Sequence, residues 1–471
     1  METITTQVAV IGAGPAGYPA AFAAADHGMK VVLIDPEINP GGVCLYRGCI
    51  PSKALLHVAE VINAAHEAEA FGLTLGAPKL DVDKLRAWKD SVIAKMTGGL
   101  AQLRLARKVT PVQGRAVFED AHTLTVQTVQ GETRRIQFEH AVIATGSRPV
   151  KIPIAPDSPR VMDSTGALAL ADIPKRMLVV GGGYIGLELG QAYSTFGSSV
   201  CVVEMLPQLL TGADRDLAQV LIQKLKKQFA SIWLETKVLE IQDTGSAVRV
   251  VMESKDGKRF EELFDRVLIS VGRRPNTENL GLEKTRVKVD AKGFIVVDPQ
   301  RRTDEPSIFA IGDVAGQPML AHKGTHEAHV AADALAGKKT VYDPAAIPAV
   351  VFTDPEIAWC GLTEIEAQQK GIAVKVAKFP WGASGRATTL GRNDGLTKII
   401  IDEASGRVLG MGIAGHGAGE LIAEGTLAVE MGAVAEDLAL TIHAHPTLSE
   451  TSMEAAESFT GHATHFLGKV R

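Results

Sequence analysis

The sequence contains few cysteines, few aromatic residues and no long apolar run. Four cysteines in 471 residues are too few for the disulfide framework of a secreted protein. No apolar segment approaches the roughly 20 residues of a membrane-spanning helix. The strand pattern that begins at Val8 leaves no room for a signal peptide. We therefore expect a cytoplasmic protein that has no membrane partner.

Neither sign of charge dominates the sequence. Lysine and arginine total 49, aspartate and glutamate total 54, and the two signs are interspersed without a basic stripe. Nucleic acid is therefore not expected as a partner. The apolar content of 46% is typical of a globular enzyme, and a chain of this length predicts about three domains at roughly 150 residues each.

Glycine, by contrast, is abundant, and some of the glycines belong to two matching motifs. Each motif has the pattern GxGxxG between an apolar strand and a helix, and each is followed by an acidic residue at the end of the next strand. The interval from the first glycine to the acidic residue is 23 positions in both motifs (12 to 35 and 181 to 204). The residues are Gly12, Gly14, Gly17 and Asp35 in the first motif and Gly181, Gly183, Gly186 and Glu204 in the second.

These motifs predict two dinucleotide sites in one chain. The glycines permit a tight turn, close approach of a pyrophosphate and close packing of helix on strand, while the acidic residue accepts hydrogen bonds from a ribose. A single such motif can be a turn that binds nothing, but two copies with equal spacing make that alternative poor. A carboxylate at Glu204 opposes the 2′-phosphate of NADP, so the second motif favours NAD.

The rest of the pattern predicts an α/β protein in which one Rossmann-like domain is inserted into another. The first domain would comprise residues 1–150 and return at 275–347, and the inserted domain would comprise 151–274. Helices are expected at 51–69 and 82–105. From about residue 348 the pattern changes to antiparallel strands and two helices, so 348–471 are expected to form a third, α+β domain.

Cys44 and Cys49 lie five positions apart, directly after the first motif. In an ideal helix residues at this interval have Cα atoms about 8 to 9 Å apart, beyond the roughly 7 Å limit for a disulfide. The two cysteines can therefore bridge only where a helix is distorted or has not begun. Two buried thiols or half of a zinc site are the alternatives, but Cys201 and Cys360 stand alone in apolar contexts, and no metal site is expected. A labile, redox-active disulfide is favoured.

Cys49 is the better electron donor of the pair. It lies nearer the start of the predicted helix, whose positive end favours a thiolate, and Lys53 adds a cation one turn later. Cys44 is then the cysteine that meets a substrate.

Seven motifs along the chain resemble those of the dihydrolipoamide dehydrogenases, members of the class I pyridine nucleotide-disulfide oxidoreductase family. They are GAGPAG, GGVCLYRGCIPSK, ATGSRP, GGGYIGLELG, IFAIGD, MLAHKG and IHAHPTLSE. The resemblance implies FAD on the first motif, NAD on the second, and a homodimer formed through the third domain. It implies partners among the lipoyl domains and peripheral-subunit-binding domains of 2-oxo acid dehydrogenase complexes, or the glycine cleavage carrier.

The resemblance also implies roles for individual residues. Cys49 would form the thiolate beside the flavin, Cys44 would exchange with lipoamide, and Lys53 would pair with Glu188 near the flavin ring. Asp313 would bind the ribityl chain. Further contacts would come from Gly42, Gly146 and Ala321 for FAD and from Val238 and Gly272 for NAD.

A base is expected near the C-terminal end, because only a thiolate attacks a disulfide. Of the two histidines that flank Ala444, the resemblance points to His445 as the base and to Glu450 as the carboxylate that orients it, with His443 structural. A lone histidine is more often a structural residue whose hydrogen bonds are satisfied than a catalyst. The sequence alone is therefore weak evidence for a catalytic base at His445. In the family arrangement this base faces the disulfide of the other subunit.

Several alternatives stay open at this stage. Other NAD(P)H-dependent disulfide reductases of the same family, such as glutathione and mercuric reductases, prefer NADPH, which Glu204 opposes. A transhydrogenase would not need both cysteines. A subunit of a complex that binds nucleotide without catalysing a reaction is an alternative from another functional class. Tyr46 and Arg47 depart from the family's usual Asn and Val, and Tyr184 could either gate the nicotinamide or pack as an ordinary side chain.

Overall fold

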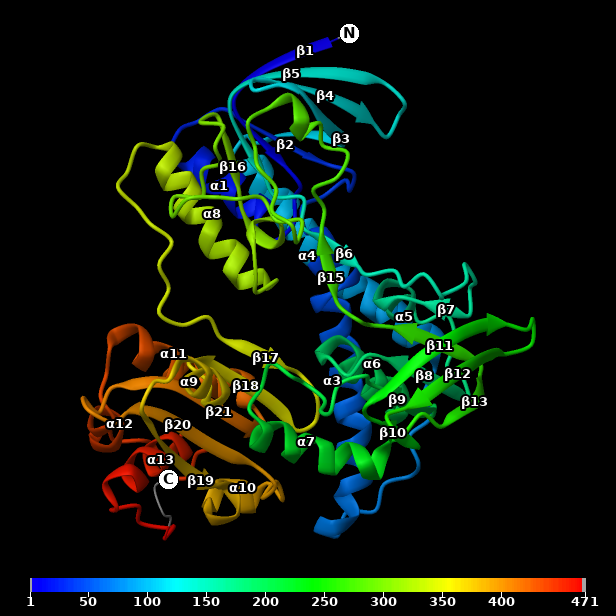
Figure 1. Ribbon diagram of the computed structural model, residues 1–471, viewed down its shortest axis with the longest axis vertical. Helices are drawn as coiled ribbons and strands as arrows, with labels where there is room; N and C mark the ends of the chain where they lie inside the picture. The colour runs from blue at the N-terminus through cyan, green and yellow to red at the C-terminus, as the bar shows by residue number, and fades with distance from the viewer. Residues whose placement is uncertain (1, 468–471) are drawn as a thin grey trace.

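A six-stranded sheet forms the centre of the first unit (Figure 1). The computed structural model describes residues 2–467. β1 is parallel to β2 and β5, and β16 is parallel to β5, whereas β3, β4 and β5 form an antiparallel meander. Unbroken apolar runs such as those of β1 and β2 suit strands that are covered on both faces. The strands are β1 (Glu2–Ile11), β2 (Val31–Asp35), β3 (Thr110–Asp120), β4 (Thr123–Thr128), β5 (Thr133–Ile143) and β16 (Ile308–Ala310).

Helices of the first unit connect it to the rest of the molecule. α1 packs against α8, while α3 packs against α4 and against α6 of the second unit. Figure 1 shows α3 and α4 running from the first sheet down past the second unit. The predicted helices at 51–69 and 82–105 correspond to α3 and α4. The segments are α1 (Gly17–Asp26), α2 (Gly42–Arg47), α3 (Cys49–Glu67), the 3₁₀ turn η1 (Ala68–Phe71), α4 (Val82–Ala106), the 3₁₀ turn η3 (Gly312–Ala315) and α8 (Ala321–Leu335).

The second unit contains a parallel sheet in the order β10-β9-β8-β14-β7 and a separate antiparallel sheet, β11-β12-β13. A helix begins at Tyr184, directly after Gly183 of the second glycine motif. The strands are β7 (Val161–Met162), β8 (Arg176–Val180), β9 (Ser199–Val203), β10 (Ser231–Trp233), β11 (Thr236–Asp243), β12 (Val248–Ser254), β13 (Arg259–Phe264) and β14 (Arg266–Ile269). The helices are α5 (Ser164–Ala169), α6 (Tyr184–Thr195) and α7 (Arg215–Gln228).

The chain leaves and re-enters the first unit through two short antiparallel strands. These are β6 (Ser147–Pro149) and β15 (Arg273–Pro275), which pair with each other. A 3₁₀ turn, η2 (Leu282–Lys284), follows, and β16 then joins the first sheet beside β5. This connectivity confirms the prediction that one Rossmann-like unit is inserted into the other.

The third unit is an antiparallel sheet in the order β17-β18-β21-β20-β19 with helices around it. Where the sequence predicts two helices, the structure has five among residues 348–467, because three of them are too short to give a periodic pattern. The strands are β17 (Ala349–Val351), β18 (Glu356–Gly361), β19 (Val374–Pro380), β20 (Leu396–Asp402) and β21 (Val408–Gly415). The helical segments are α9 (Glu364–Lys370), η4 (Trp381–Ala383), α10 (Gly385–Thr389), α11 (Ala418–Met431), α12 (Ala435–Leu440) and α13 (Glu450–Thr460). Across residues 2–467, no helix is both long enough and apolar enough to cross a membrane.

Candidate active site

The first glycine turn follows β1 and is closed by Asp35 at the end of β2. Asp35 accepts hydrogen bonds from the N–H groups of Ala13 (2.7 Å) and Glu37 (2.8 Å). A carboxylate has about four acceptor positions, so Asp35 retains capacity for ribose hydroxyls. A Cβ at Gly17 would lie only 1.8 Å from the carbonyl oxygen of Gly12. The third glycine of the motif is therefore required for close packing of α1 on the turn.

The two cysteines are brought together by a break between two helices. α2 ends at Arg47 and α3 begins at Cys49, so Gly48 alone separates them. A Cβ at Gly48 would lie 2.9 Å from the Val43 carbonyl oxygen, which only glycine avoids. Cys44 and Cys49 are free thiols that hydrogen-bond to each other. The break supplies the departure from helical geometry that a Cys44–Cys49 bridge requires.

The surroundings of the pair distinguish one thiol from the other. The hydrogen bond from Cys44, helped by the Lys53 ammonium and opposed by burial and Glu188, lowers the pKa of Cys49 to about 7. The same hydrogen bond, together with burial, raises the pKa of the Cys44 thiol well above its ordinary value. These shifts favour the thiolate at Cys49 and the protonated thiol at Cys44.

An ion pair with a buried carboxylate lies next to Cys49. Lys53 on α3 donates to Glu188 on α6 at 2.8 Å, and Glu188 also accepts the N–H of Phe352 at 3.0 Å. The Glu188 side chain is 3% exposed, and the Lys53 ammonium lies 4.3 Å from the centre of the Phe352 ring. The pair joins all three units at the cysteines, and the lysine supplies the cation that favours a thiolate.

One large cavity joins the first glycine turn to the cysteines. Its volume is about 1060 Å³, at the upper limit of the roughly 300 to 1,000 Å³ typical of small-molecule pockets. A dinucleotide cofactor fits this size. The sequence-predicted residues that line it are Gly12, Gly14, Asp35, Gly42, Cys44, Cys49, Lys53, Gly146, Glu188, Asp313 and Ala321. Tyr184 lines it as well, at the start of α6.

A buried charge cluster supports the Asp313 turn and is not anticipated from the sequence. Glu327 is fully buried, accepts the N–H of Gly312 at 2.6 Å, and pairs with Lys323 and Arg301, each at 3.0 Å. These contacts fix the backbone on which Asp313 faces the cavity. The available sequence signal is the Lys323–Glu327 pair, spaced i,i+4 on the buried face of an alanine-rich helix.

The second glycine turn repeats the geometry of the first. Glu204 accepts from the N–H of Gly182 at 2.7 Å and from that of Leu206 at 2.8 Å, just as Asp35 accepts from Ala13 and Glu37. Gly183 directly precedes α6, and a Cβ at Gly186 would lie 2.6 Å from the Gly181 carbonyl oxygen. The turn is thus built for the same kind of ligand as the first.

The two remaining residues expected at the second turn lie on neighbouring elements. Val238 is on β11 and packs against the apolar core of the second unit. Gly272 follows β14 with a φ of 111°, a conformation that favours glycine, and its carbonyl accepts the N–H of Val150.

His445 and Glu450 pair in the third unit, outside the cavity lining. His445 Nδ1 lies 2.9 Å from Glu450, and the His445 side chain is 74% exposed. Burial raises the pKa of Glu450, but the hydrogen bonds from the Thr447 N–H and from His445 outweigh it, so the net pKa is below the ordinary value. His443 instead uses both ring nitrogens, one with Glu424 at 2.6 Å and the other with a backbone carbonyl.

Within the described chain, therefore, the base and the cysteines are not brought together. Among residues 2–467, Nε2 of His445 has no hydrogen-bond partner, and His445 does not line the cavity that the cysteines line. No histidine among residues 2–467 lines that cavity.

The unusual residues between the cysteines, Tyr46 and Arg47, each bond to a partner outside the cysteine pair. Arg47 pairs with Glu37, and both line the cavity beside Asp35. The Tyr46 hydroxyl donates to the Asn39 carbonyl at 3.1 Å. The Arg47 side chain therefore lies at the Asp35 end of the cavity, whereas Tyr46 is not among the residues that line it.

Two family models match the chain. Residues 6–328 match the family described as "Pyridine nucleotide-disulphide oxidoreductase", and residues 347–456 match its "dimerisation domain". A dihydrolipoyl dehydrogenase of Haemophilus influenzae is 50% identical over 98% of this chain and 97% of that protein. The dihydrolipoyl dehydrogenase of Geobacillus stearothermophilus is 44% identical over 99% of this chain and 98% of that protein.

Solved structures agree with these relationships. LpdA from Mycobacterium tuberculosis has a TM-score of 0.89 at 27% identity, over 96% of this chain and 99% of that chain. The HOCl-induced flavoprotein disulfide reductase RclA from Escherichia coli has a TM-score of 0.85 at 28% identity, with the same coverage of each. The inserted Rossmann-like units, the paired cysteines on the cavity wall and these similarities lead to one conclusion: the chain belongs to the pyridine nucleotide-disulphide oxidoreductase family.

Proposed function

We propose that this protein oxidises a dihydrolipoyl group to its cyclic disulfide and transfers the electron pair to NAD⁺. The observation that carries the proposal is the Cys44–Cys49 pair at the cavity wall, with a thiolate-favouring environment at Cys49 only. Similarity over nearly the full length of curated dihydrolipoyl dehydrogenases supports the substrate class.

FAD is the cofactor that best fits the large cavity. Its pyrophosphate would lie against the first glycine turn and the start of α1, where backbone N–H groups favour anions, and Asp35 would accept its ribose hydroxyls. When bound, FAD would accept the electron pair from the cysteines and deliver it to nicotinamide as hydride. The proposed FAD contacts are Gly12, Gly14, Gly17, Asp35, Gly42, Lys53, Gly146, Asp313 and Ala321.

NAD is proposed at the second glycine turn, because Glu204 there matches Asp35 in its hydrogen bonds and disfavours a 2′-phosphate. Tyr184 directly follows Gly183 of this turn and also lines the large cavity. The proposed NAD contacts are Gly181, Gly183, Gly186, Glu204, Val238 and Gly272.

The dithiol half of the reaction begins with the cysteines joined in a disulfide. His445 takes the proton of one substrate thiol, and the resulting thiolate attacks Cys44, which breaks the Cys44–Cys49 bond and leaves Cys49 as a thiolate. The second substrate thiol then attacks the mixed disulfide, releases the cyclic product and gives its proton to Cys44. Two electrons have moved to the cysteines, with one proton on His445 and one on Cys44.

This product state matches the electrostatics of the site. The pKa of Cys44 is raised and that of Cys49 is lowered, as a protonated Cys44 beside a Cys49 thiolate requires. Glu450, whose pKa lies below its ordinary value, stays ionised at neutral pH and stabilises the protonated imidazole of His445.

A homodimer is part of the proposal, because each site needs a histidine that its own chain does not bring to the cavity. The match of residues 347–456 to a dimerisation domain supports it. The protein-bound substrate would be a lipoyl domain of a 2-oxo acid dehydrogenase complex or a glycine cleavage carrier, with a peripheral-subunit-binding domain as a docking partner.

The domain limits follow the same division. FAD would be bound by 1–150 with the return segment 275–347, NAD by 151–274, and the dimer contact would lie in 348–471. The antiparallel pair of β6 and β15 supports the first two limits, because the chain passes between units there.

A steady-state assay tests the proposal. The purified protein should reduce NAD⁺ with free dihydrolipoamide, and should use NADP⁺ poorly. Efficient reduction of glutathione disulfide by NADPH, without turnover of dihydrolipoamide, would instead identify another disulfide reductase of the same family.

A further inference from the structure

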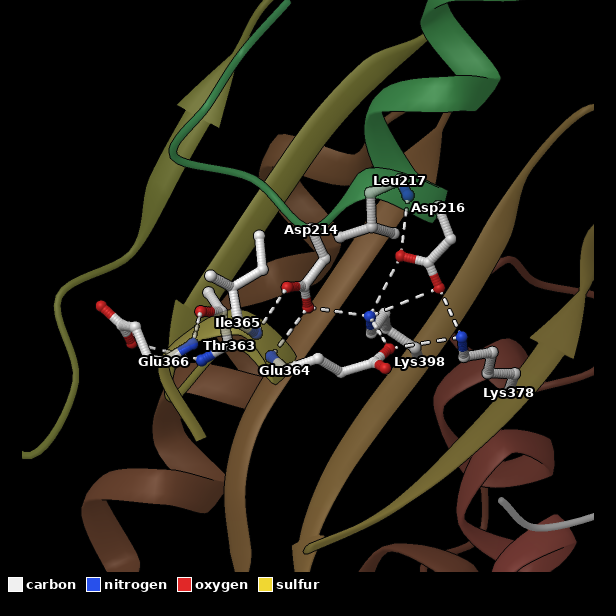
Figure 2. Close-up of polar contacts among 9 residues, drawn as sticks. All are labelled: Asp214, Asp216, Leu217, Thr363, Glu364, Ile365, Glu366, Lys378 and Lys398. Atoms are coloured by element: carbon white, nitrogen blue, oxygen red, sulfur yellow. Dashed lines mark hydrogen bonds and ion pairs between the residues drawn. The ribbon is translucent and has the colours of Figure 1, made fainter. Parts of the chain in front are cut away.

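A cluster of charged residues joins the second and third units, far along the chain from the cysteines (Figure 2). We call it the Lys398 cluster; it comprises Asp214, Asp216, Glu364, Lys378 and Lys398. The Lys398 ammonium lies 2.8 Å from Asp214 and 3.0 Å from Asp216, and it also contacts Glu364. Lys378 adds a second cation, 2.6 Å from Asp216 and 3.3 Å from Glu364.

The charges of this cluster depend on one another. The Lys398 side chain is 0% exposed, and a buried ammonium is stable only when it is paired. Burial lowers the pKa of Lys398, but the surrounding carboxylates outweigh burial and the net shift is upward. The oxygens of Asp214, Asp216 and Glu364 lie close enough to hold a metal ion, yet Figure 2 shows the lysine ammonium directed between them. Lys398 therefore serves as the cation of this site.

The cluster holds one end of a loop whose other end closes the second glycine turn. The loop, residues 204–214, begins at Glu204, which accepts the N–H of Gly182, and ends at Asp214 immediately before α7. Asp214 also accepts the N–H groups of Glu364 and Ile365 at the start of α9. The loop is thus fastened to the second unit at one end and to the third unit at the other.

The middle of the loop packs directly under the turn. The Leu210 N–H donates to the Gly182 carbonyl at 3.0 Å, and a Cβ at Gly182 would lie 2.3 Å from Leu209. Leu209 is fully buried. The loop contacts the backbone of the turn directly, so a shift of the loop would move the place where the adenosine half of a dinucleotide is proposed to lie.

The third unit also contacts α7 beyond the charges. A Cβ at Gly412 on β21 would lie 2.4 Å from Leu217, so the helix packs against bare strand backbone. Both the charges and this packing fix the start of α7, which carries Asp214 at its N-terminal edge.

We infer that Lys398 is a positioning residue for pyridine nucleotide binding, acting from the third unit through Asp214 and the 204–214 loop. This inference rests on the proposed NAD site at the second turn. It assigns the third unit a part in nucleotide affinity in addition to dimer formation.

The test compares Lys398→Met with the wild-type holoenzyme and with Lys375→Met. Lys375 lies on the same sheet, is 43% exposed and pairs with Glu403 at 3.5 Å, so its replacement controls for the loss of one lysine. The probe is ADP-ribose, which carries the adenosine half and accepts no hydride, and its Kd is measured by calorimetry. Two further readouts are the FAD content and the anaerobic rate of flavin reduction by dihydrolipoamide.

We expect Lys398→Met to weaken ADP-ribose binding by about two- to thirtyfold, the range that coupling through packed elements produces. The rate of flavin reduction by dihydrolipoamide and the FAD content should stay at the wild-type level, as should the Kd in Lys375→Met. An unchanged Kd, or an equal loss of dithiol reduction and ADP-ribose binding, overturns the inference.

If Lys398→Met fails to fold, Glu364→Gln decides the matter. This variant removes one charge from the partly exposed edge of the cluster while keeping the size of the side chain. A weaker Kd with normal FAD content supports the inference and an unchanged Kd overturns it. If wild-type protein binds no ADP-ribose at all, the proposed NAD site itself is wrong, and that outcome is distinct from the others.

Discussion

Replacement of Lys53 by methionine should raise the pKa of Cys49. The hydrogen bond from Cys44 lowers that pKa most and burial raises it; the Lys53 ammonium lowers it further, Glu188 raises it, and the net value is about 7. Removal of the lysine takes away the stabilising cation and leaves the carboxylate without its 2.8 Å partner. A single nearby charge typically moves a pKa by about one to three units. A rise of only about one unit would reduce the thiolate fraction at pH 7 from about a half to about a tenth.

Alkylation of the reduced protein measures this change, because only the thiolate reacts. The iodoacetamide rate at Cys49, followed from about pH 5 to about pH 10, should rise through a midpoint near 7 in the wild type and near 8 or above in Lys53→Met. The double variant Lys53→Met/Glu188→Gln removes both charges, so its midpoint should lie below that of the single variant. A midpoint that stayed near 7 in Lys53→Met would refute the electrostatic account of Cys49.

Three further predictions concern the base and the two ends of the cofactor sites. His445→Gln should lower dihydrolipoamide oxidation by about 10²- to 10⁴-fold, while NADH-to-dye activity remains. Mixed dimers of His445→Gln and Cys49→Ser subunits should regain one working site. Mixed dimers without dihydrolipoamide oxidation would argue against a site shared between subunits. Glu204→Arg should shift the ratio of kcat/KM from NAD towards NADP, and unchanged selectivity would remove the ribose argument. Arg47→Val, which breaks the pair with Glu37, should speed FAD release by up to about fivefold in a fluorescence assay, and an equal rate would place Arg47 outside the cofactor contacts.

Local patterns in the sequence predict the parts of the site that depend on local structure. The glycine turns and their acidic partners follow from spacing alone, and Asp35 and Glu204 make the same pair of hydrogen bonds. The requirement that a helix be interrupted between the cysteines follows from helix geometry, and the structure places that interruption at Gly48. These features depend on residues a few positions apart or on one repeated unit.

Contacts between distant segments could not be predicted in this way. Lys398 occurs in an ordinary apolar strand, and only the packing of the second unit on the third brings Asp214, 184 positions earlier, within 2.8 Å. Glu327 is similar, because its role depends on the turn at Gly312 folding back on α8. The short helices of the third unit escaped prediction because five to seven residues do not establish a period.

The most direct test of the account is the visible spectrum of two single variants of the purified flavoprotein. In Cys44→Ser above about pH 7, the Cys49 thiolate should lie beside the flavin and add an absorption band at longer wavelength than the flavin's own, which disappears as the pH falls through the Cys49 pKa. Cys49→Ser, with the same flavin content, should lack that band at every pH. A band that is equal in both variants, or a purified protein without flavin, would contradict the claim that Cys49 is the thiolate in contact with the cofactor.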